Sequence, residues 1–441
     1  MNAIIGILVG LLSLGLMMFL HELGHFWTGL KLGFKVEEFS IFMGPRLFSW
    51  VKNGIRYSLK LLPIGASVQF GGEYSSDIEM VGPEARAKGY FYAMPIWKRF
   101  WTIFWGPGVN LVTAFLAFVL YFNLIGQSIP VIQNLPEQGL MARAGAKVGD
   151  TLKSIEGYPI RNELDYMAAM RLYGQKDELK VLLQKADGSE VESSVTNALV
   201  DRRYLGITQE LTQDTSLVKV ASVSQEQNGG APNLEVGDQI LAVNGQSLKE
   251  HSLSELLEKM DEKETEVELK VLRDGREMLL QVKPIVRSER LDSRLQFTNQ
   301  KGFISSIPYA WNYSVSVVKA TFRILGQVFV GGVKPAEALS GPVGIVSMYS
   351  TVVGASGIDW AAKGLQLIYL FAMISLSLGI MNFLPIPPLD GSVILLLIVE
   401  KIRGKKLSPR AMEIVNGAGV FIILALAVYV LGIDLLRIFH R

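Results

Sequence analysis

Cysteine is absent from this 441-residue chain, and histidine is scarce, with four residues. Without thiolates the chain forms no disulfide bond, and a metal site can use only histidine, aspartate and glutamate side chains. His251 and His440 lie in polar or terminal segments, so a site with three histidines is not expected. The formal net charge is +2 and no long run of one sign occurs, which argues against a nucleic acid as partner.

Apolar residues are concentrated in four segments. The chain is 49% hydrophobic and 19% charged, with a mean hydropathy of +0.30, which fits neither an ordinary soluble protein nor a bundle of membrane spans alone. We expect spans at 4–30, 100–125, 365–399 and 414–431, because runs of about 18 or more nearly uncharged residues can cross a bilayer. A buried soluble helix is the alternative for each. The first segment lacks a basic start and a small-residue cleavage site, so it does not fit a simple signal peptide.

Three ionisable side chains interrupt the first apolar segment, within the sequence HELGH at 21–25. His21 and His25 are four residues apart, on one face of a helix, so their ring nitrogens can converge on one divalent metal ion. Glu22 can then act as general base toward an attacking water molecule. The pattern is the HExxH of zinc hydrolases. Because a charge at the bilayer centre costs about 2.5 to 3.5 kcal/mol, such residues usually mark a site. The alternatives are a chance match and histidines that merely snorkel from the end of a helix.

Prolines break the third apolar segment, in the sequence NFLPIPPLDG at 382–391. Proline removes helical N–H groups, and non-helical backbone at membrane depth is tolerated only where it is buried in protein or lines a cavity. The sequence therefore predicts a polar site here. Asp390 is placed to complete a metal shell with the two histidines, leaving a fourth position for water. Asn382 offers an amide for the substrate backbone or an oxyanion. A simple proline kink, with Asp390 at a helix N-terminus, is the alternative.

The middle of the chain contains an internal repeat. The segment 147–157 (KVGDTLKSIEG) recurs as 235–245 (EVGDQILAVNG), and an Asp-Gly hairpin signal follows in each copy. The pattern resembles PDZ domains, which we place at 127–208 and 209–306. A glycine-containing turn lies at the end of each copy of the repeat, whereas an ordinary PDZ domain begins with such a turn. This position favours the circularly permuted form of the domain. PDZ domains bind extended peptides at a sheet edge; spacers or size filters without a bound peptide are the alternative.

Basic residues predict the orientation of the spans. Ten lysines and arginines lie between the first two spans, and five lie between the last two. Both links should be cytoplasmic, because short cytoplasmic loops carry the excess of positive charge. The N-terminus, the middle region and the C-terminal tail then lie outside, and 21–25 falls toward the cytoplasmic end of the first span.

Together these features resemble the site-2 proteases, specifically the bacterial RseP type, over essentially the whole chain. The resemblance rests on HExxH in the first span, N-x-x-P-x-P-x-L-D-G in the third, and tandem PDZ domains between the second and third. It implies an intramembrane zinc metalloendopeptidase with one Zn²⁺ per chain. It also implies roles for individual residues: His21, His25 and Asp390 as metal ligands, Glu22 as catalytic base, and Asn382, Pro385 and Pro387 in substrate positioning.

The implied fold class is a polytopic α-helical membrane protein with four transmembrane segments, a membrane-reentrant β-loop over 56–72, and two inserted PDZ-like domains. The segments 106–110 and 340–344 also match family motifs. Relatives usually read LDGG, often followed by histidine, whereas Ser392 and Val393 stand here, so the packing after Asp390 is where this chain departs from the pattern. The expected parts are 1–126 with two spans and the β-loop, 127–208 and 209–306 as PDZ-like domains, 307–360 as an amphipathic helical linker, and 361–441 with two spans.

The implied partners are the lipid bilayer and single-pass transmembrane proteins that another protease has already trimmed. Anti-sigma factors and remnant signal peptides are the usual substrates of such proteases. The PDZ-like pair would bind peptide C-termini or exclude bulky substrates. The implied location is the inner membrane of a Gram-negative bacterium, with the N-terminus, the PDZ-like domains and the C-terminus in the periplasm.

Three other functions compete with this interpretation. A CAAX-type or heat-shock HExxH membrane protease would take its third ligand from a glutamate in a late helix, and no E-x-x-x-[DE] occurs in a plausible late span. A secondary transporter would show an inverted repeat of its spans, which is not visible. A catalytically silent, membrane-anchored PDZ scaffold would have lost Glu22 or a ligand, and all of these residues are present.

Overall fold

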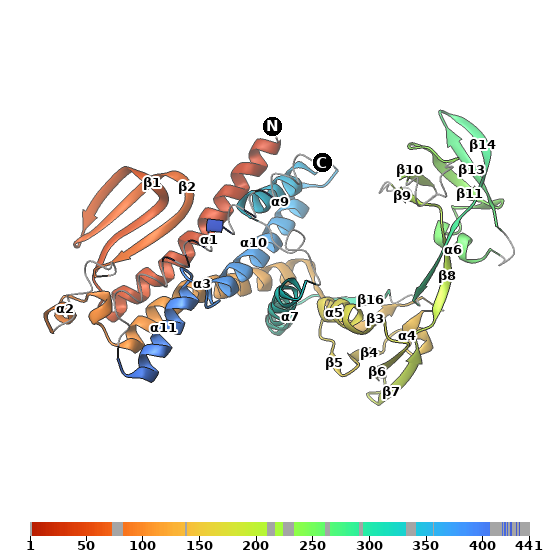
Figure 1. Cartoon of the computed structure of the whole chain (residues 1–441). Coiled ribbons are helices and arrows are strands. Elements are labelled where there is room, and N and C mark those ends of the chain that lie inside the picture. The colour runs from red at the N-terminus through yellow and green to blue at the C-terminus, as the bar shows by residue number, and fades with distance from the viewer. Residues whose placement is uncertain are drawn as a thin grey trace. The chain divides into compact units, whose positions relative to one another are not determined.

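The computed structural model describes most of the chain in two compact units (Figure 1). One unit comprises 1–129 and 299–441, and the other comprises 130–298. The described residues are 2–72, 83–136, 139–209, 217–223, 233–260, 265–290, 294–331, 341–355, 357–405 and separate positions between 417 and 432.

Three helices of the first unit are long and apolar enough to cross a membrane: α1 (Asn2–Leu32), α3 (Ile96–Ile125) and α10 (Trp360–Asn382). They correspond to the first three expected spans. Both α1 and α10 pack against α3. The fourth expected span, 414–431, falls largely outside the described residues.

Glycine lets α1 and α3 approach closely. A Cβ atom added to Gly24 would lie 2.1 Å from the carbonyl oxygen of Trp105, and one added to Gly106 would lie 2.1 Å from Nε2 of His25. Small residues permit such contacts between membrane helices, where no hydrophobic effect drives association. The crossing therefore sets the backbone of α1 at its HExxH segment directly against α3.

A β-sheet follows α1 and is more extensive than the sequence predicts. It is built from β1 (Val36–Lys52) and β2 (Ile55–Phe70), and each of these strands folds back once. Their pairing gives the spatial order 46–52, 55–60, 36–41, 66–70. Asn53 and Gly54 both have positive φ, 54° and 78°, as the two central residues of a type I′ hairpin turn require. The segment 66–70 lies at one edge of this sheet.

The predicted break in the third apolar segment is confirmed. Helix α10 ends at Asn382, and α11 (Asp390–Arg403) begins only after the proline-rich turn. Arg99 of α3 holds α11 through a bidentate ion pair with Glu400, with N–O distances of 2.6 and 3.0 Å. The remaining helices of this unit are α2 (Pro83–Ala87), η2 (Phe91–Ala93), α7 (Phe303–Phe329) and α9 (Pro342–Gly354).

The second unit contains two similar sheets, each with its own hydrophobic core. The first has the order β16-β3-β4-β6-β7, with β5 beside β4. Its strands are β3 (Gln127–Asn134), β4 (Thr151–Ile155), β5 (Tyr158–Pro159), β6 (Glu178–Gln184), β7 (Glu190–Thr196) and β16 (Gln296–Gln300). Helices α4 (Leu140–Arg143) and α5 (Glu163–Tyr173) accompany this sheet.

The second sheet has the order β14-β13-β11-β10-β9, with β12 beside β11. Its strands are β9 (Ile207–Gln209), β10 (Val218–Val223), β11 (Gln239–Val243), β12 (Gln246–Ser247), β13 (Val267–Arg273) and β14 (Arg276–Val282), and α6 (Leu253–Glu258) packs on it. A separate two-stranded ribbon joins β8 (Leu199–Tyr204) to β15 (Ile285–Arg290).

The two sheets do not follow the expected domain boundary between residues 208 and 209, because each sheet includes residues from the other side of this boundary. β9 belongs to the second sheet, and β16, from the end of the repeat region, belongs to the first. The cores explain the exchange, because Leu205 is buried in the second core and Phe297 in the first. The division into two PDZ-like domains stays a prediction.

The residues shared by the two repeats perform the same local tasks. Asp150 accepts a hydrogen bond from the backbone N–H of Lys147 at 2.9 Å, and Asp238 accepts one from that of Glu235 at 2.8 Å. The glycine before each aspartate has positive φ, 92° and 97°. Each VGD sequence is therefore a turn held by its own buried carboxylate, which explains why both copies contain it.

Candidate metal centre

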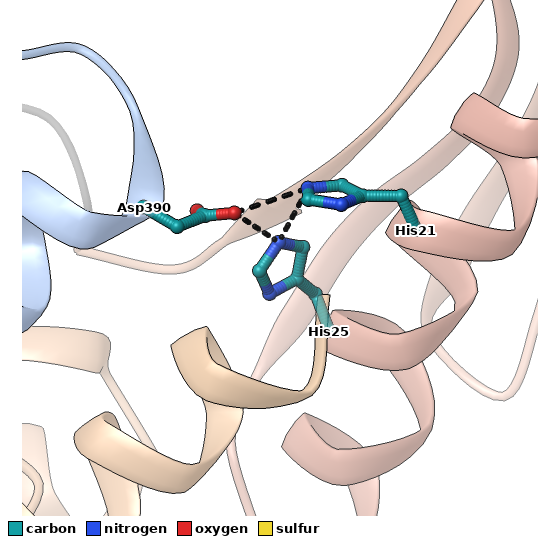
Figure 2. A group of neighbouring side chains, drawn as sticks. All are labelled: His21, His25 and Asp390. Atoms are coloured by element: carbon teal, nitrogen blue, oxygen red, sulfur yellow. Dashed lines mark hydrogen bonds and ion pairs between the residues drawn. The ribbon is translucent and has the colours of Figure 1, made fainter. Parts of the chain in front are cut away.

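Three predicted ligands from distant parts of the sequence meet in one cluster (Figure 2). His21 and His25 project from successive turns of α1, and Asp390 is the first residue of α11. The two Nε2 atoms are 3.2 Å apart, and Oδ2 of Asp390 lies 3.1 Å from Nε2 of His21 and 3.4 Å from Nε2 of His25. Figure 2 shows both rings and the carboxylate directed toward a common point.

The orientation of His25 is set by α3. Its Nδ1 lies 2.9 Å from the carbonyl oxygen of Thr102, and both groups are buried. A carbonyl oxygen can only accept, so Nδ1 carries the proton and Nε2 keeps its lone pair. The ring lies against Gly106, where any side chain would collide with it. Nε2 is thereby directed at the cluster in the tautomer that binds a metal ion.

Glu22 is half-buried beside the cluster and is held by the β-sheet. Its Oε2 accepts a hydrogen bond from the backbone N–H of Val68 at 2.9 Å. Val68 belongs to the edge segment 66–70, so the N–H is directed out of the sheet toward α1. The sequence did not indicate this contact, because the two residues are far apart in the chain and the donor is a backbone group.

The donor set fits a zinc ion. Imidazole nitrogen and carboxylate oxygen are common zinc ligands, and atoms about 2.0 to 2.1 Å from a tetrahedral ion lie about 3.3 Å from one another. The observed triangle, with sides of 3.1, 3.2 and 3.4 Å, matches that spacing. Among the described residues this is the only cluster of three such ligands. His251, in the second unit, instead lies 3.6 Å from Glu255.

The turn before Asp390 places the other predicted residues. Asn382 is the last residue of α10 and is half-buried, and its side chain makes no hydrogen bond within the described part of the chain. Pro385 is exposed and Pro387 is half-buried. Gly419, in the region of the fourth expected span, lies against Pro387, because a Cβ at this glycine would be 2.1 Å from the Cβ of the proline.

The departure from the LDGG pattern is accommodated locally. Gly391 must lack a side chain, because a Cβ there would lie 2.2 Å from the carbonyl oxygen of Phe383. Ser392 is buried, and its hydroxyl donates to the carbonyl oxygen of Leu389 at 2.7 Å. Val393 packs against an apolar cluster that includes Phe26 of α1. These contacts hold the first turn of α11, on which Asp390 lies.

Comparison with known proteins shows the family of this chain. The profile of peptidase family M50 matches residues 9–426, so the chain belongs to this family, the site-2 proteases. The similar proteins include protease RseP of Yersinia pestis, 27% identical over 98% of this chain and 97% of the relative. The regulator of sigma-W protease RasP of Bacillus subtilis is 28% identical over 96% and 97%. A relative from Vibrio cholerae, 26% identical over 95% and 96%, carries zinc metalloprotease in its name.

The protein is therefore a metalloprotease of the site-2 protease family, and its cofactor is zinc. Three of its described helices are long and apolar enough to cross a membrane. The resemblance found from the two sequence motifs is confirmed. The roles of individual residues, the number of spans and the nature of the substrate remain proposals.

We predict that Asp390→Ala lowers the zinc content well below one ion per chain and abolishes proteolysis, because two histidines alone bind zinc weakly. Metal analysis of the purified, detergent-solubilised protein measures this directly. The control is Asp359→Ala, which removes the N-cap of α10, where the carboxylate accepts from the N–H of Ala362 at 2.6 Å. The control should cost about 0.5 to 2 kcal/mol of stability while zinc and activity remain. Full zinc content in Asp390→Ala would show that the ligand set is wrong.

Proposed function

We propose that this protein is an intramembrane endopeptidase that hydrolyses peptide bonds within the transmembrane segments of single-pass proteins. His21, His25 and Asp390 hold one zinc ion, and Glu22 is the catalytic base. The observation that carries the proposal is the triangle of ligand atoms between α1 and α11, two of which lie on α1, a helix long and apolar enough to cross a membrane. Ionisable groups in such segments usually mark a functional site.

The bound zinc would polarise the scissile carbonyl group and make water a better nucleophile at neutral pH. Glu22 accepts the proton of the attacking water and delivers it to the leaving amine. The N–H of Val68 fixes one oxygen of this carboxylate, at 2.9 Å, and leaves the other for the proton transfer. The general base is thus held by the sheet and not only by its own helix.

The sheet edge at 66–70 supports a role in holding the substrate. This segment pairs with 36–41 on one side, and no further strand pairs with its other side in the described structure. A peptide bond inside a transmembrane helix is shielded by the helix, so the substrate must unwind before hydrolysis. Pairing with a sheet edge replaces the lost backbone hydrogen bonds. The sheet also exposes apolar side chains suited to lipid contact, namely Met43, Leu47, Phe48, Trp50, Val51, Leu61 and Leu62.

Glu22→Gln should reduce cleavage of a model transmembrane substrate by about 10²-fold or more, because general-base catalysis typically supplies about 10²- to 10⁴-fold. Glutamine retains an oxygen that can accept from Val68, so folding and a zinc content near one per chain should be preserved. Cleavage assays and metal analysis on the same preparation test both statements. Activity within about tenfold of wild type would refute the assignment of the base.

Asn382, Pro385 and Pro387 position the substrate in this proposal. The prolines end α10 and leave a non-helical segment whose backbone can meet an extended peptide. The Asn382 amide at the end of α10, without a hydrogen bond in the described structure, is available to the substrate backbone or to the oxyanion.

Asn382→Ala should slow turnover by about 10²- to 10³-fold if the amide donates to the oxyanion. The zinc content should be unchanged. Asn382→Leu, which retains volume, should act in the same way. Melting temperature and turnover are measured on the same samples. A destabilised variant with normal turnover per folded molecule would show that Asn382 only terminates the helix.

The second unit is proposed to act as a PDZ-like peptide module and size filter on the outer face of the membrane. Among the described strands its second sheet ends at β9, which lies beside a cavity of about 250 Å³. The cavity is lined by Leu205 and Ile207, by Leu253 and Leu257 of α6, and by several arginines. An edge strand beside a groove lined by both apolar side chains and arginines suits an extended peptide, and the arginines suit a terminal carboxylate.

The filter and the orientation can be tested in this cysteine-free chain. A cysteine placed at exposed Glu192 should react with a membrane-impermeant maleimide from the outer face, as the basic links predict. Deleting 130–298 should preserve catalysis and admit substrates with bulky outer domains. The deletion is geometrically simple, because the entering and leaving chains lie side by side, with Asn299 Nδ2 3.2 Å from the carbonyl oxygen of Ile125. Labelling only from the cytoplasmic side would overturn the orientation.

The substrates are proposed to be anti-sigma factors or remnant signal peptides already trimmed by another protease. The support is the name of one relative, a regulator of sigma-W protease. We further propose that the protein lies in the inner membrane of a Gram-negative bacterium, with four spans, the N-terminus and C-terminus in the periplasm, and the active site toward the cytoplasm.

A further inference from the structure

Asn110 is a buried polar residue beside the metal cluster, and the chemistry described above does not use it. It lies on α3 with 1% of its surface exposed. Its Nδ2 faces Nδ1 of His21 at 3.5 Å, and its Oδ1 is buried without a hydrogen-bond partner among the described residues. A buried amide oxygen without a partner costs about 1 to 3 kcal/mol, so this arrangement calls for an explanation.

The position of the proton on the His21 ring supplies the explanation. Its Nε2 faces Asp390 and His25, so Nε2 is the atom that binds zinc in the proposed shell. A histidine bound to a metal through Nε2 carries its proton on Nδ1 and needs an acceptor there. The oxygen and nitrogen of an asparagine amide are nearly equal in shape and are assigned from their hydrogen bonds. Turning the Asn110 amide by half a rotation places Oδ1 opposite Nδ1–H and gives the isolated oxygen a donor.

We propose that Asn110 is a positioning residue for the metal site, and this inference rests on the proposed ligand set. Its amide oxygen accepts the Nδ1–H of His21 and thereby fixes the tautomer and the ring orientation in which Nε2 faces the zinc. Outer partners of this kind orient metal ligands, and their loss typically weakens metal binding by about 10- to 100-fold.

The surroundings of Asn110 are built to hold it. Its backbone carbonyl accepts a hydrogen bond from the buried hydroxyl of Ser375, on α10, at 3.0 Å. Two turns earlier on α3, the carbonyl oxygen of Thr102 performs the corresponding task for His25. Helix α3 thus presents one acceptor to each histidine, a backbone oxygen to one and a side-chain oxygen to the other. Only the second can be removed by substitution.

The test measures zinc affinity, by competition with a chelator of known affinity, on the detergent-solubilised full chain. Asn110→Leu, similar in volume but without an acceptor, should weaken zinc binding by about 10- to 100-fold. Asn110→Asp restores an oxygen acceptor and should bind zinc close to wild type. The matched control is Thr113→Val, a half-buried isosteric loss of a hydroxyl on the same helix, which should not change the affinity.

A spectroscopic measurement separates positioning from a general loss of structure. In protein loaded with Co²⁺ in place of zinc, the visible bands should shift in Asn110→Leu and return toward wild type in Asn110→Asp. Wild-type zinc affinity in Asn110→Leu would overturn the inference, and so would equal weakening in the leucine and aspartate variants, which would indicate a role in packing alone. Failure of the ligand set itself would appear separately, as full zinc content in Asp390→Ala.

Discussion

The geometry of the metal centre depends on one close contact, the crossing of α1 over α3. Gly24 lies under the backbone of Trp105, and Gly106 lies under the ring of His25, with no room for a side chain at either position. Any larger residue would push α1 away from α3 and separate His25 from its acceptor on Thr102. Close approach of this kind is how helices associate where lipid is as apolar as the side chains. The two clustered histidines, His21 and His25, are therefore placed by backbone packing.

Helix α3 also contacts the other helices around the His21–His25–Asp390 cluster. Polar groups inside apolar surroundings are costly unless each has a partner, and α3 supplies several of these partners. It offers the carbonyl oxygen of Thr102 to α1 and the carbonyl oxygen of Asn110 to Ser375 of α10. Through Arg99 it pairs with Glu400 of α11, the helix that carries Asp390. Helix α3, which contributes no side chain to the His21–His25–Asp390 cluster, thus contacts α1, α10 and α11.

The β-sheet brings a different kind of group to the site, a backbone edge. Val68 lies on the edge segment, and its N–H holds the carboxylate of Glu22. An extended peptide added to that edge would run past Glu22, since the edge and this carboxylate are in contact in the structure. In the proposed function, this arrangement would let the substrate unwind beside Glu22.

Much of the chemistry could be predicted from the sequence, because local spacing determines it. HExxH places two histidines on one helical face, and the prolines before Asp390 must end a helix, whatever surrounds them. Three of the four apolar runs correspond to the three long helices, and the repeat that contains VGD predicted a pair of similar domains. The resemblance to the site-2 proteases followed from the two motifs, and the family match agrees with it.

Contacts between distant residues were decided only by the tertiary structure. No spacing indicates that Val68 reaches Glu22, that Thr102 and Asn110 face the two histidines, or that Arg99 pairs with Glu400. The exchange of strands between the two sheets likewise depends on which core buries Leu205 and Phe297. The reason is the same in each case. A helix or a turn is determined by residues that are neighbours in the chain. A backbone acceptor or a buried hydrogen-bond partner could serve many side chains, and only the packing of the folded chain decides which side chain it contacts.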